Sequence, residues 1–536
     1  MRTALIIGSG PAAAATALAL AGDGSVAVTV VDLGTELEDE RRLARERMSA
    51  LQPGQWDPDD LRLVARPPAG DGAGRLPEKL SFGSSYPFAE AGQLSPMAVE
   101  QGIVGALISG GYGGFSAVWG SQLLPYPRGE MGAWPVSEED MAPHYRSVLD
   151  AVPFAAAEDD LAGPLPLYGL PQPPLPLSSR ARAILDRYRR HRTALNRMGL
   201  LLGQARTGVR ASACVACGLC MTGCPYSLIY SSAHTLDDLR ARGRITYHGN
   251  LLAVRVEEDT TSATVVTRHR STGEQHTFTA DRVFVACGAI GSARLVLDSL
   301  RVYGEDVPVL ESAQFLVPFV SSRSAGDPLQ QQAHAMSQLS SVLDLPAVAA
   351  ERIHLQLYTY NPSFVEALPG VVRDGPGRAA MGQLLSRLSV GLGYLPSSVS
   401  PRMRLRLNAP ASPSLRAPLV VTRDPSSPDA RPLMRPIKRA LLRIAPHLDL
   451  WPIVPRVTLT PLGKSYHWGG SFPHAEPSSR GRFGSDRAGR VAGWRRVHLV
   501  DGAVAPSLAA TSFTLTIMAN AHRIASEALA LGEGAS

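Results

Sequence analysis

The chain has 536 residues, which is too long for one small binding module and indicates several folding units. Its 45% hydrophobic and 19% charged residues, with 50 glycines and 43 prolines, are typical of a loop-rich globular enzyme and exclude a collagen-like or low-complexity chain. The net charge is only +6, and no apolar run approaches the ~18 residues of a membrane span, so we expect no transmembrane segment.

The N-terminal residues predict a strand, a glycine turn, a helix and a second strand. Strand Ala4–Ile7 runs into Gly8, Gly10 and Ala13, and the second strand ends at Asp32. In a dinucleotide site the first glycine permits the turn, the second lets a pyrophosphate approach, and the small third residue lets helix pack on strand. An acid after the second strand accepts hydrogen bonds from a ribose. The pattern predicts FAD or NAD binding; a tight turn in an unrelated α/β domain is the alternative.

The location of the protein is predicted from its N-terminus and its cysteines. A secretory signal needs a charged region, an apolar stretch and a small-residue cleavage site, whereas Thr3–Ile7 already forms a strand. Four of the five cysteines fall within Cys214–Cys224. Such clustering is typical of metal ligation in a reducing compartment rather than of a disulfide framework. We therefore expect a cytoplasmic protein.

The next part of the chain is predicted to be rich in loops. Residues 33–105 show no regular pattern, 109–120 are dense in glycine and 164–176 in proline. A helix is predicted at Arg180–Met198. It opens a basic block, Arg180–Arg210, which holds nine arginines, no lysine and one acid. Because no zinc-finger, homeodomain or RNA-recognition signature accompanies this block, we expect no nucleic-acid partner.

The second half alternates strands and helices. A small meander is predicted from strand-like runs at 250–257, 261–269, 276–280 and 282–286. Further strands are predicted at 314–320, 353–360, 403–407 and 418–422. Helices are predicted at 292–300, near 433–449 and at 513–531. The helix near 433–449 has one apolar face, formed by Met434, Ile437, Leu441, Ile444 and Leu448.

Four ordered segments carry a family resemblance. They are the N-terminal glycine turn, residues 113–120, residues 286–291 and the C-terminal stretches 499–506 and 512–517. Together they resemble the glucose–methanol–choline (GMC) flavin oxidoreductases, in which the corresponding segments wrap one FAD. Besides the residues of the N-terminal motif, the resemblance implies FAD contacts from Gly113, Gly114, Ser116, Trp119, Gly288, Asp501, Ala503 and Thr514.

The segment from Gly113 to Tyr126 resembles most the subgroup that includes the pyranose oxidases. In that subgroup a histidine of this loop can be bonded covalently to the flavin. The corresponding residue here, one before Trp119, is Val118. Valine has no nucleophile, so we expect FAD to be bound non-covalently.

Hydride transfer from an alcohol requires a base for the hydroxyl proton, and a histidine can serve near neutral pH. The family places this histidine in an H-x-x-G segment, which corresponds here to His467, followed by Trp468 and Gly469. We predict His467 as the base, with His474 as the alternative. The family's second catalytic position, histidine or asparagine, is Ser512 here. Serine can hydrogen-bond the substrate oxygen but cannot act as a base.

A polar strand face is predicted in the substrate region. Alternation along 353–360 places His354, Gln356, Tyr358 and Tyr360 on one side. Such a face suits a hydroxyl-rich substrate, and a solvent-facing edge strand is an equal alternative.

The clustered cysteines have the spacing of a bacterial ferredoxin run: Cys214, Cys217, Cys220 and Cys224, followed by proline. Four thiolates in one run predict a [4Fe–4S] or a [3Fe–4S] cluster. A zinc site and plain reduced thiols are the alternatives. Some membrane-associated GMC dehydrogenases carry a three-iron cluster near the flavin, held by cysteines whose spacing resembles that of Cys214, Cys220 and Cys224.

The predicted fold class is α/β, with a GMC-type Rossmann-like FAD-binding domain (1–305 and 461–536) and an inserted antiparallel-sheet substrate domain (306–460). The predicted function is an FAD-dependent dehydrogenase that oxidises a small-molecule alcohol, such as a sugar or polyol. A hydrogen peroxide-producing oxidase and an electron-transfer or redox-sensing flavoprotein are the alternatives. The basic block predicts docking of an acidic electron-acceptor protein, with a solvated surface or an anionic substrate site as the alternatives.

Overall fold

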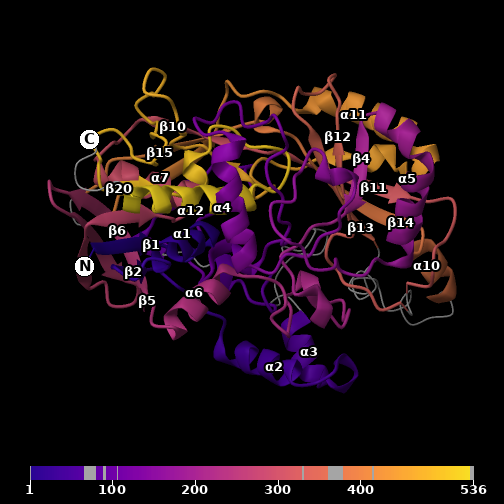
Figure 1. Cartoon of the computed structure of the whole chain (residues 1–536), viewed down its shortest axis with the longest axis horizontal. Helices are drawn as coiled ribbons and strands as arrows, with labels where there is room; N and C mark the ends of the chain where they lie inside the picture. The colour runs from indigo at the N-terminus through magenta and orange to yellow at the C-terminus, as the bar shows by residue number, and fades with distance from the viewer. Residues whose placement is uncertain are drawn as a thin grey trace.

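The computed structural model describes residues 2–65, 80–88, 92–105, 107–328, 331–359, 378–412 and 416–530. Two regions lie side by side in Figure 1, a parallel sheet with its helices on the left and an antiparallel sheet with its helices on the right. Among the described helices, none is long and apolar enough to cross a membrane.

The parallel sheet brings the two ends and the middle of the chain together. Its strand order is β20-β9-β1-β2-β5. β1 is buried from Ala4 to Ile7, as expected for a strand covered on both faces. The bounds are β1 Arg2–Ile7, β2 Val26–Val31, β5 Ile245–His248, β9 Arg282–Val285 and β20 Val497–Leu499.

Helices and a small meander cover the two faces of this sheet. One core includes residues of α1, α4, α6 and α12, and α1 lies against α12. The other includes residues of α7 and the antiparallel meander β6-β7-β8. The predicted meander is thus confirmed for its first three runs, whereas the fourth, 282–286, belongs to the parallel sheet as β9. The bounds are α1 Pro11–Ala21, α4 Glu138–Ala151, α6 Ser232–Ala241, α7 Ala289–Ser299, α12 Thr514–Ala530, β6 Leu251–Glu258, β7 Ala263–His269 and β8 Gln275–Ala280.

The antiparallel sheet has the order β17-β11-β14-β13-β12-β4, and β18 also pairs with β11. The bounds are β4 Leu200–Gln204, β11 Gln314–Val320, β12 Leu339–Leu343, β13 Ile353–Thr359, β14 Leu388–Tyr394, β17 Trp451–Pro452 and β18 Thr458–Leu459. The predicted sheet is therefore present, and β4 joins it from outside the predicted range 306–460. The domain boundaries themselves stay a prediction.

Two helices pack on this sheet, α5 (Ser179–Arg197) and α11 (Met434–Leu448). All five residues of the predicted apolar face of α11 are buried, so that prediction is confirmed. Further strands form a mixed sheet in the order β19-β10-β15-β16-β3. The remaining bounds are β3 Met97–Val99, β10 Asp306–Glu311, β15 Met403–Leu407, β16 Leu419–Arg423, β19 Trp468–Gly469 and α10 Arg378–Leu385.

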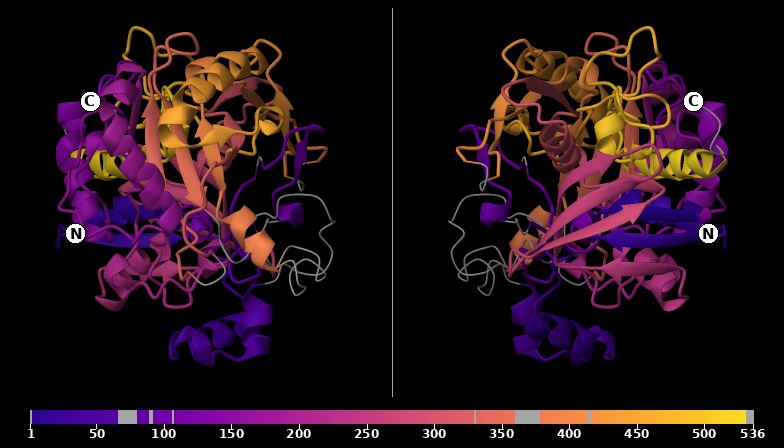
Figure 2. Two further views of the ribbon diagram at one scale, coloured as in Figure 1. Left: turned by 90° about the vertical axis from the view of Figure 1, so that its right-hand side faces the viewer. Right: turned by 90° about the vertical axis from the view of Figure 1, so that its left-hand side faces the viewer.

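The prediction that residues 33–105 lack regular structure is wrong. Helices α2 (Asp39–Ser49) and α3 (Pro58–Ala65) lie there and project from the body of the molecule (Figure 2). Charged residues dominate α2, which buries only Ala44 and Met48, so it gives little apolar periodicity. The two helices pack on each other and on Phe82, which explains why an isolated pattern missed them.

Candidate active site

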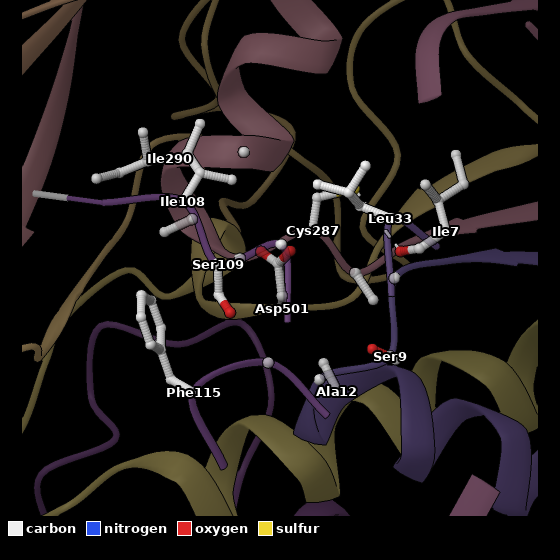
Figure 3. A pocket seen from close by; sticks show the side chains of 18 of the residues that line it. Ile7, Ser9, Ala12, Leu33, Ile108, Ser109, Phe115, Cys287, Ile290 and Asp501 are labelled. Carbon is white, nitrogen blue, oxygen red and sulfur yellow. Dashed lines mark hydrogen bonds between the residues drawn. The ribbon is translucent and has the colours of Figure 1, made fainter. Parts of the chain in front are cut away.

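A first cavity of about 270 Å³ opens beside the glycine turn between β1 and α1. Figure 3 shows it between the start of α1, with Ser9 and Ala12, and the Asp501 carboxyl. Segments from the whole length of the chain line it. Among the residues predicted for the cofactor, those lining it are Gly8, Gly10, Asp32, Gly114, Gly288, Asp501 and Thr514.

The backbone at the glycine turn allows other groups to approach it closely. Gly8 has φ +108°, and a Cβ there would lie 2.5 Å from the Ala286 carbonyl oxygen. Gly10 precedes α1 without any side-chain cap, and a Cβ on it would meet no atom within 4 Å. The open N-terminus of α1 therefore presents free N–H groups and the positive end of the helix dipole to the cavity, as a pyrophosphate requires.

Two buried carboxyl groups face this cavity. Burial raises the pKa of Asp32 to about 7, although it accepts hydrogen bonds from the Ser9 and Tyr247 hydroxyls. Burial likewise raises the pKa of Asp501 to about 6, and the Ser292 hydroxyl and the Ala503 amide donate to it. Hydroxyl groups of a bound ribose or ribityl chain would give these carboxylates further donors. The residues present thus fit a dinucleotide cofactor.

Other predicted cofactor residues have different positions. Ala13 is buried in α1 and lets that helix pack closely. The Gly113 amide donates to the Ser9 hydroxyl over 3.0 Å, and the Ala503 amide donates to the Asp501 carboxylate over 2.8 Å, so both residues support the site without lining it. Ser116 and Trp119 line a second cavity instead.

The second cavity, of about 320 Å³, adjoins the first. The residues common to both are Pro11, Phe115, Tyr466 and Thr514. His467, Ser512 and Val118 line the second cavity. Several polar residues of its wall, mainly from the antiparallel sheet, have no predicted role in the site: Gln122, Gln314 and Tyr394.

His467 lies between two aromatic rings. The Tyr394 ring stacks on it with centroids 4.7 Å apart, and Phe513 contacts it edge-on at 5.5 Å. Its Nδ1 is buried and has no hydrogen-bond partner among the described residues, whereas Nε2 is not enclosed in this way. Burial lowers the pKa of His467 to about 4, so the ring is neutral at pH 7 and can accept a proton.

A buried carboxyl group fixes the loop that carries His467. The Ser465 hydroxyl accepts from the His467 amide over 3.1 Å and donates to Glu311 Oε1 over 2.7 Å. Glu311 also accepts from the Gly463 amide at 3.0 Å. Burial raises the pKa of Glu311 to about 7. Because Glu311 lines neither cavity, it acts as a positioning group behind the loop.

His474, the alternative base, lines neither cavity. Its Nδ1 contacts the Asp486 carbonyl oxygen at 2.6 Å, and its Nε2 contacts the Asn520 amide nitrogen at 3.1 Å. Both ring nitrogens are thus engaged in the core beneath α12. The geometry favours His467 for contact with a ligand.

The polar face predicted on β13 points inward. Gln356 and Tyr358 line the second cavity, and His354 lies behind it, bonded to the Ser340 hydroxyl at 2.7 Å. Because β13 lies between β12 and β14, the solvent-facing edge is excluded. Tyr360 lies outside the described residues.

The clustered cysteines are free thiols, and the structure does not support a preformed metal site. Within the described parts of the chain, no group of three or more His, Cys, Asp or Glu side chains could hold a metal ion. Burial raises the pKa of Cys220 to about 12, and the Ala335 amide donates to its sulfur over 3.4 Å. The neighbouring Met221 and Met336 line the second cavity, so the cysteine segment adjoins it.

The basic block is partly structural. Arg180 and Arg206 are buried and donate to backbone carbonyls. On α5, Arg187 donates to the Pro446 carbonyl, and Arg192 forms an ion pair with Asp160. The net positive charge of the basic block therefore overstates the charge that its exposed residues offer to a partner.

Comparisons with known proteins identify the fold. No family model matches the sequence, and no curated protein matches it. Among solved structures, pyridoxine 4-oxidase from Mesorbium loti is 13% identical with a TM-score of 0.59, covering 98% of this chain and 99% of that one. A formate oxidase is 15% identical with a TM-score of 0.60, covering 99% and 98%. The chain has the α/β GMC fold, with a Rossmann-like parallel sheet and an antiparallel sheet beside it.

Proposed function

We propose that this protein is an FAD-dependent oxidoreductase that oxidises a small-molecule alcohol. The observation that carries the proposal is the junction of two cavities at Phe115 and Tyr466. One is built like a dinucleotide site, and the other contains a neutral histidine with an accessible nitrogen. The fold similarity to two oxidases supports a redox reaction.

Bound FAD would supply the hydride acceptor. The α1 N-terminus and Gly114 would hold its pyrophosphate, and Asp32 would hold a ribose. Val118 lines the second cavity at the position of the predicted flavinylation site and offers no nucleophile. FAD is therefore proposed to be non-covalent, in a chain related to the pyranose-oxidase-like subgroup.

His467 would take the hydroxyl proton of the alcohol. Its ring is neutral at pH 7 because burial lowers its pKa to about 4. The clamp between Tyr394 and Phe513 fixes its plane, and Glu311 fixes its loop through Ser465. A base held in one orientation removes the proton as the hydride leaves, which contributes about 10²–10⁴-fold to the rate.

The electron acceptor separates a dehydrogenase from an oxidase. The sequence favours a dehydrogenase, whereas the solved structures named above are oxidases. Oxygen uptake with stoichiometric hydrogen peroxide during alcohol oxidation would establish an oxidase. Reduction of an artificial dye without oxygen uptake would establish a dehydrogenase. A vestigial, purely electron-transferring flavoprotein would react with no alcohol.

An iron–sulfur cluster at Cys214–Cys224 remains part of the proposal on sequence spacing. No metal-binding group is assembled among the described residues, so no electron path is assigned through these thiols. Anaerobically purified protein should contain iron and acid-labile sulfide, and Cys220→Ser should remove both. Stoichiometric zinc without sulfide, or no metal, would contradict the cluster. We also propose that an acidic electron-acceptor protein docks on the exposed arginines of α5. We propose a cytoplasmic location for the protein.

The direct test is an anaerobic screen of alcohols, sugars and polyols against the purified yellow protein. The proposed function predicts that at least one compound reduces the flavin and is converted to the carbonyl product. Failure of every compound, with normal reduction by dithionite, would contradict an alcohol substrate.

A further inference from the structure

Two tyrosine residues line the second cavity, and their hydroxyl groups differ in whether the proton has an acceptor. The Tyr358 hydroxyl donates to Gln356 Oε1 over 3.0 Å. The Tyr394 hydroxyl accepts from Gln314 Nε2 over 2.9 Å, and its own proton has no acceptor among the described residues. Tyr394 is 5% exposed, and burial raises its pKa to about 12. At neutral pH this hydroxyl is therefore a donor without a partner.

The sheet fixes Tyr394 in place. It is the last residue of β14, where its backbone lies between Gln314 of β11 and His354 of β13. The rings of His354 and His467 stack near Tyr394, with centroid distances of 6.2 and 4.7 Å. The phenol is thus held in one orientation beside the proposed base, and Gln314 holds its oxygen.

We propose that Tyr394 is a catalytic residue that donates a hydrogen bond to the substrate oxygen while His467 takes the proton from that oxygen. This role rests on the proposed function. It would supply the second polar contact at a site where Ser512 replaces the family's histidine or asparagine. A serine hydroxyl rotates freely, whereas the phenol is fixed by a stack and a hydrogen bond.

The reaction that Tyr394 would assist is a two-electron oxidation. The O–H proton of the alcohol would pass to His467 Nε2, and the carbon that bears the hydroxyl would lose a hydride and become a carbonyl carbon. Bound FAD would supply the acceptor for that hydride and its two electrons. Negative charge develops on the oxygen if the proton leaves ahead of the hydride. A fixed donor that is itself buried stabilises that charge strongly.

The donation from Gln314 strengthens this donor. A hydroxyl that accepts one hydrogen bond becomes a better donor of the next, because the two bonds polarise each other. Gln314 also occupies one lone pair of the phenol oxygen, which turns the O–H away from the amide. Both residues line the cavity that holds His467 and Ser512.

The test compares three variants by anaerobic stopped-flow reduction with an alcohol that reduces the wild type. Tyr394→Phe keeps the ring and its stack but removes the hydroxyl, and we expect the limiting rate to fall about 10²–10³-fold. The alcohol concentration giving half the limiting rate should change little. Ser512→Ala should lose less rate than Tyr394→Phe. Tyr188→Phe, a buried control whose hydroxyl bonds Asp160 on the far side of the sheet, should match the wild type.

Measurements other than the rate distinguish loss of the hydroxyl from damage to the fold. FAD content and melting temperature of Tyr394→Phe should match the wild type, and the deuterium isotope effect on the transferred hydrogen should be retained or increased. Should Tyr394→Phe fold poorly, Gln314→Met supplies a second test, with an intermediate loss of rate expected.

The outcomes distinguish this role from the proposed function. A loss below about tenfold in Tyr394→Phe, or a larger loss in Ser512→Ala, overturns the role of Tyr394, since removal of one such donor costs about 10²–10³-fold. If dithionite but no alcohol reduces the wild-type flavin, the proposed function itself fails and this role fails with it.

Discussion

The imidazole of His467 stacks on the phenol of Tyr394, with ring centroids 4.7 Å apart and ring planes inclined by 24°. His467 belongs to the loop just before β19, and Tyr394 ends β14 of the antiparallel sheet. The contact therefore joins the two regions of the fold at the second cavity. It places a proposed base from one region against a polar wall from the other.

The two histidines of the C-terminal region should respond differently to removal. His467→Ala should lower turnover by about 10²–10⁴-fold with FAD content unchanged, because it removes a positioned base. His474→Ala should mainly lower the melting temperature, since it leaves the Asn520 side chain and the Asp486 carbonyl without a buried partner, at about 1–3 kcal/mol each. Steady-state kinetics and thermal unfolding on both variants check this. A larger rate loss in a stable His474→Ala would show that the base is misassigned.

The flavin should be dissociable. Val118, the residue at the predicted flavinylation position, lines the second cavity and has no nucleophile, so acid precipitation should release all of the yellow chromophore into the supernatant. Colour that stays with the precipitated protein would contradict non-covalent binding.

The glycine turn should tolerate no side chain at Gly8. Gly8→Ala would place a Cβ 2.5 Å from the Ala286 carbonyl oxygen, in a backbone conformation with positive φ. The turn must shift, so we expect loss of FAD together with a lower melting temperature. Gly132→Ala is the matched control, because a Cβ there meets no atom within 4 Å. Equal FAD content in Gly8→Ala and Gly132→Ala would argue against this turn as the pyrophosphate site.

Glu311 should make stability depend on pH. Burial raises its pKa from 4.5 to about 7, so the protonated form is favoured in the folded state. The contribution of protonated Glu311 to the free energy of unfolding is therefore fully present below pH 4.5 and is lost as the pH rises through 7. Between pH 5 and 8 the free energy of unfolding of the wild type should fall relative to Glu311→Gln, by about 1–3 kcal/mol. Urea unfolding at several pH values measures this difference. A difference that grows in the opposite direction would show that Glu311 is ionised in the fold.

The sequence predicts those parts of the fold that depend on residues close together in the chain. The turn at Gly8 and Gly10 and the apolar face of α11 depend on neighbours in the chain, and both were predicted. Helix α2 was missed because its burial depends on α3 and Phe82 rather than on its own periodicity. Tyr394 and Gln314 could not be found in advance, because only the pairing of β14 with β11 brings them together, and only the folded chain stacks Tyr394 on His467.

The cysteine run shows that a clear sequence pattern need not correspond to an assembled site. Its spacing matches an iron–sulfur pattern, yet spacing does not fix where four side chains point. Within the described residues the thiols form no group that could hold a metal ion. What the structure adds is their neighbourhood, since Met221 of the same segment lines the second cavity.

The most direct test of His467 as the base in alcohol oxidation is anaerobic reduction of the bound flavin by alcohols in wild-type protein and in His467→Ala. We predict that an alcohol bleaches the wild-type flavin rapidly, and that the same alcohol bleaches the His467→Ala flavin about 10²–10⁴-fold more slowly. Dithionite should reduce both proteins alike. Equal rates with the alcohol in both proteins would contradict His467 as the base. Reduction by dithionite but by no alcohol would contradict alcohol oxidation itself.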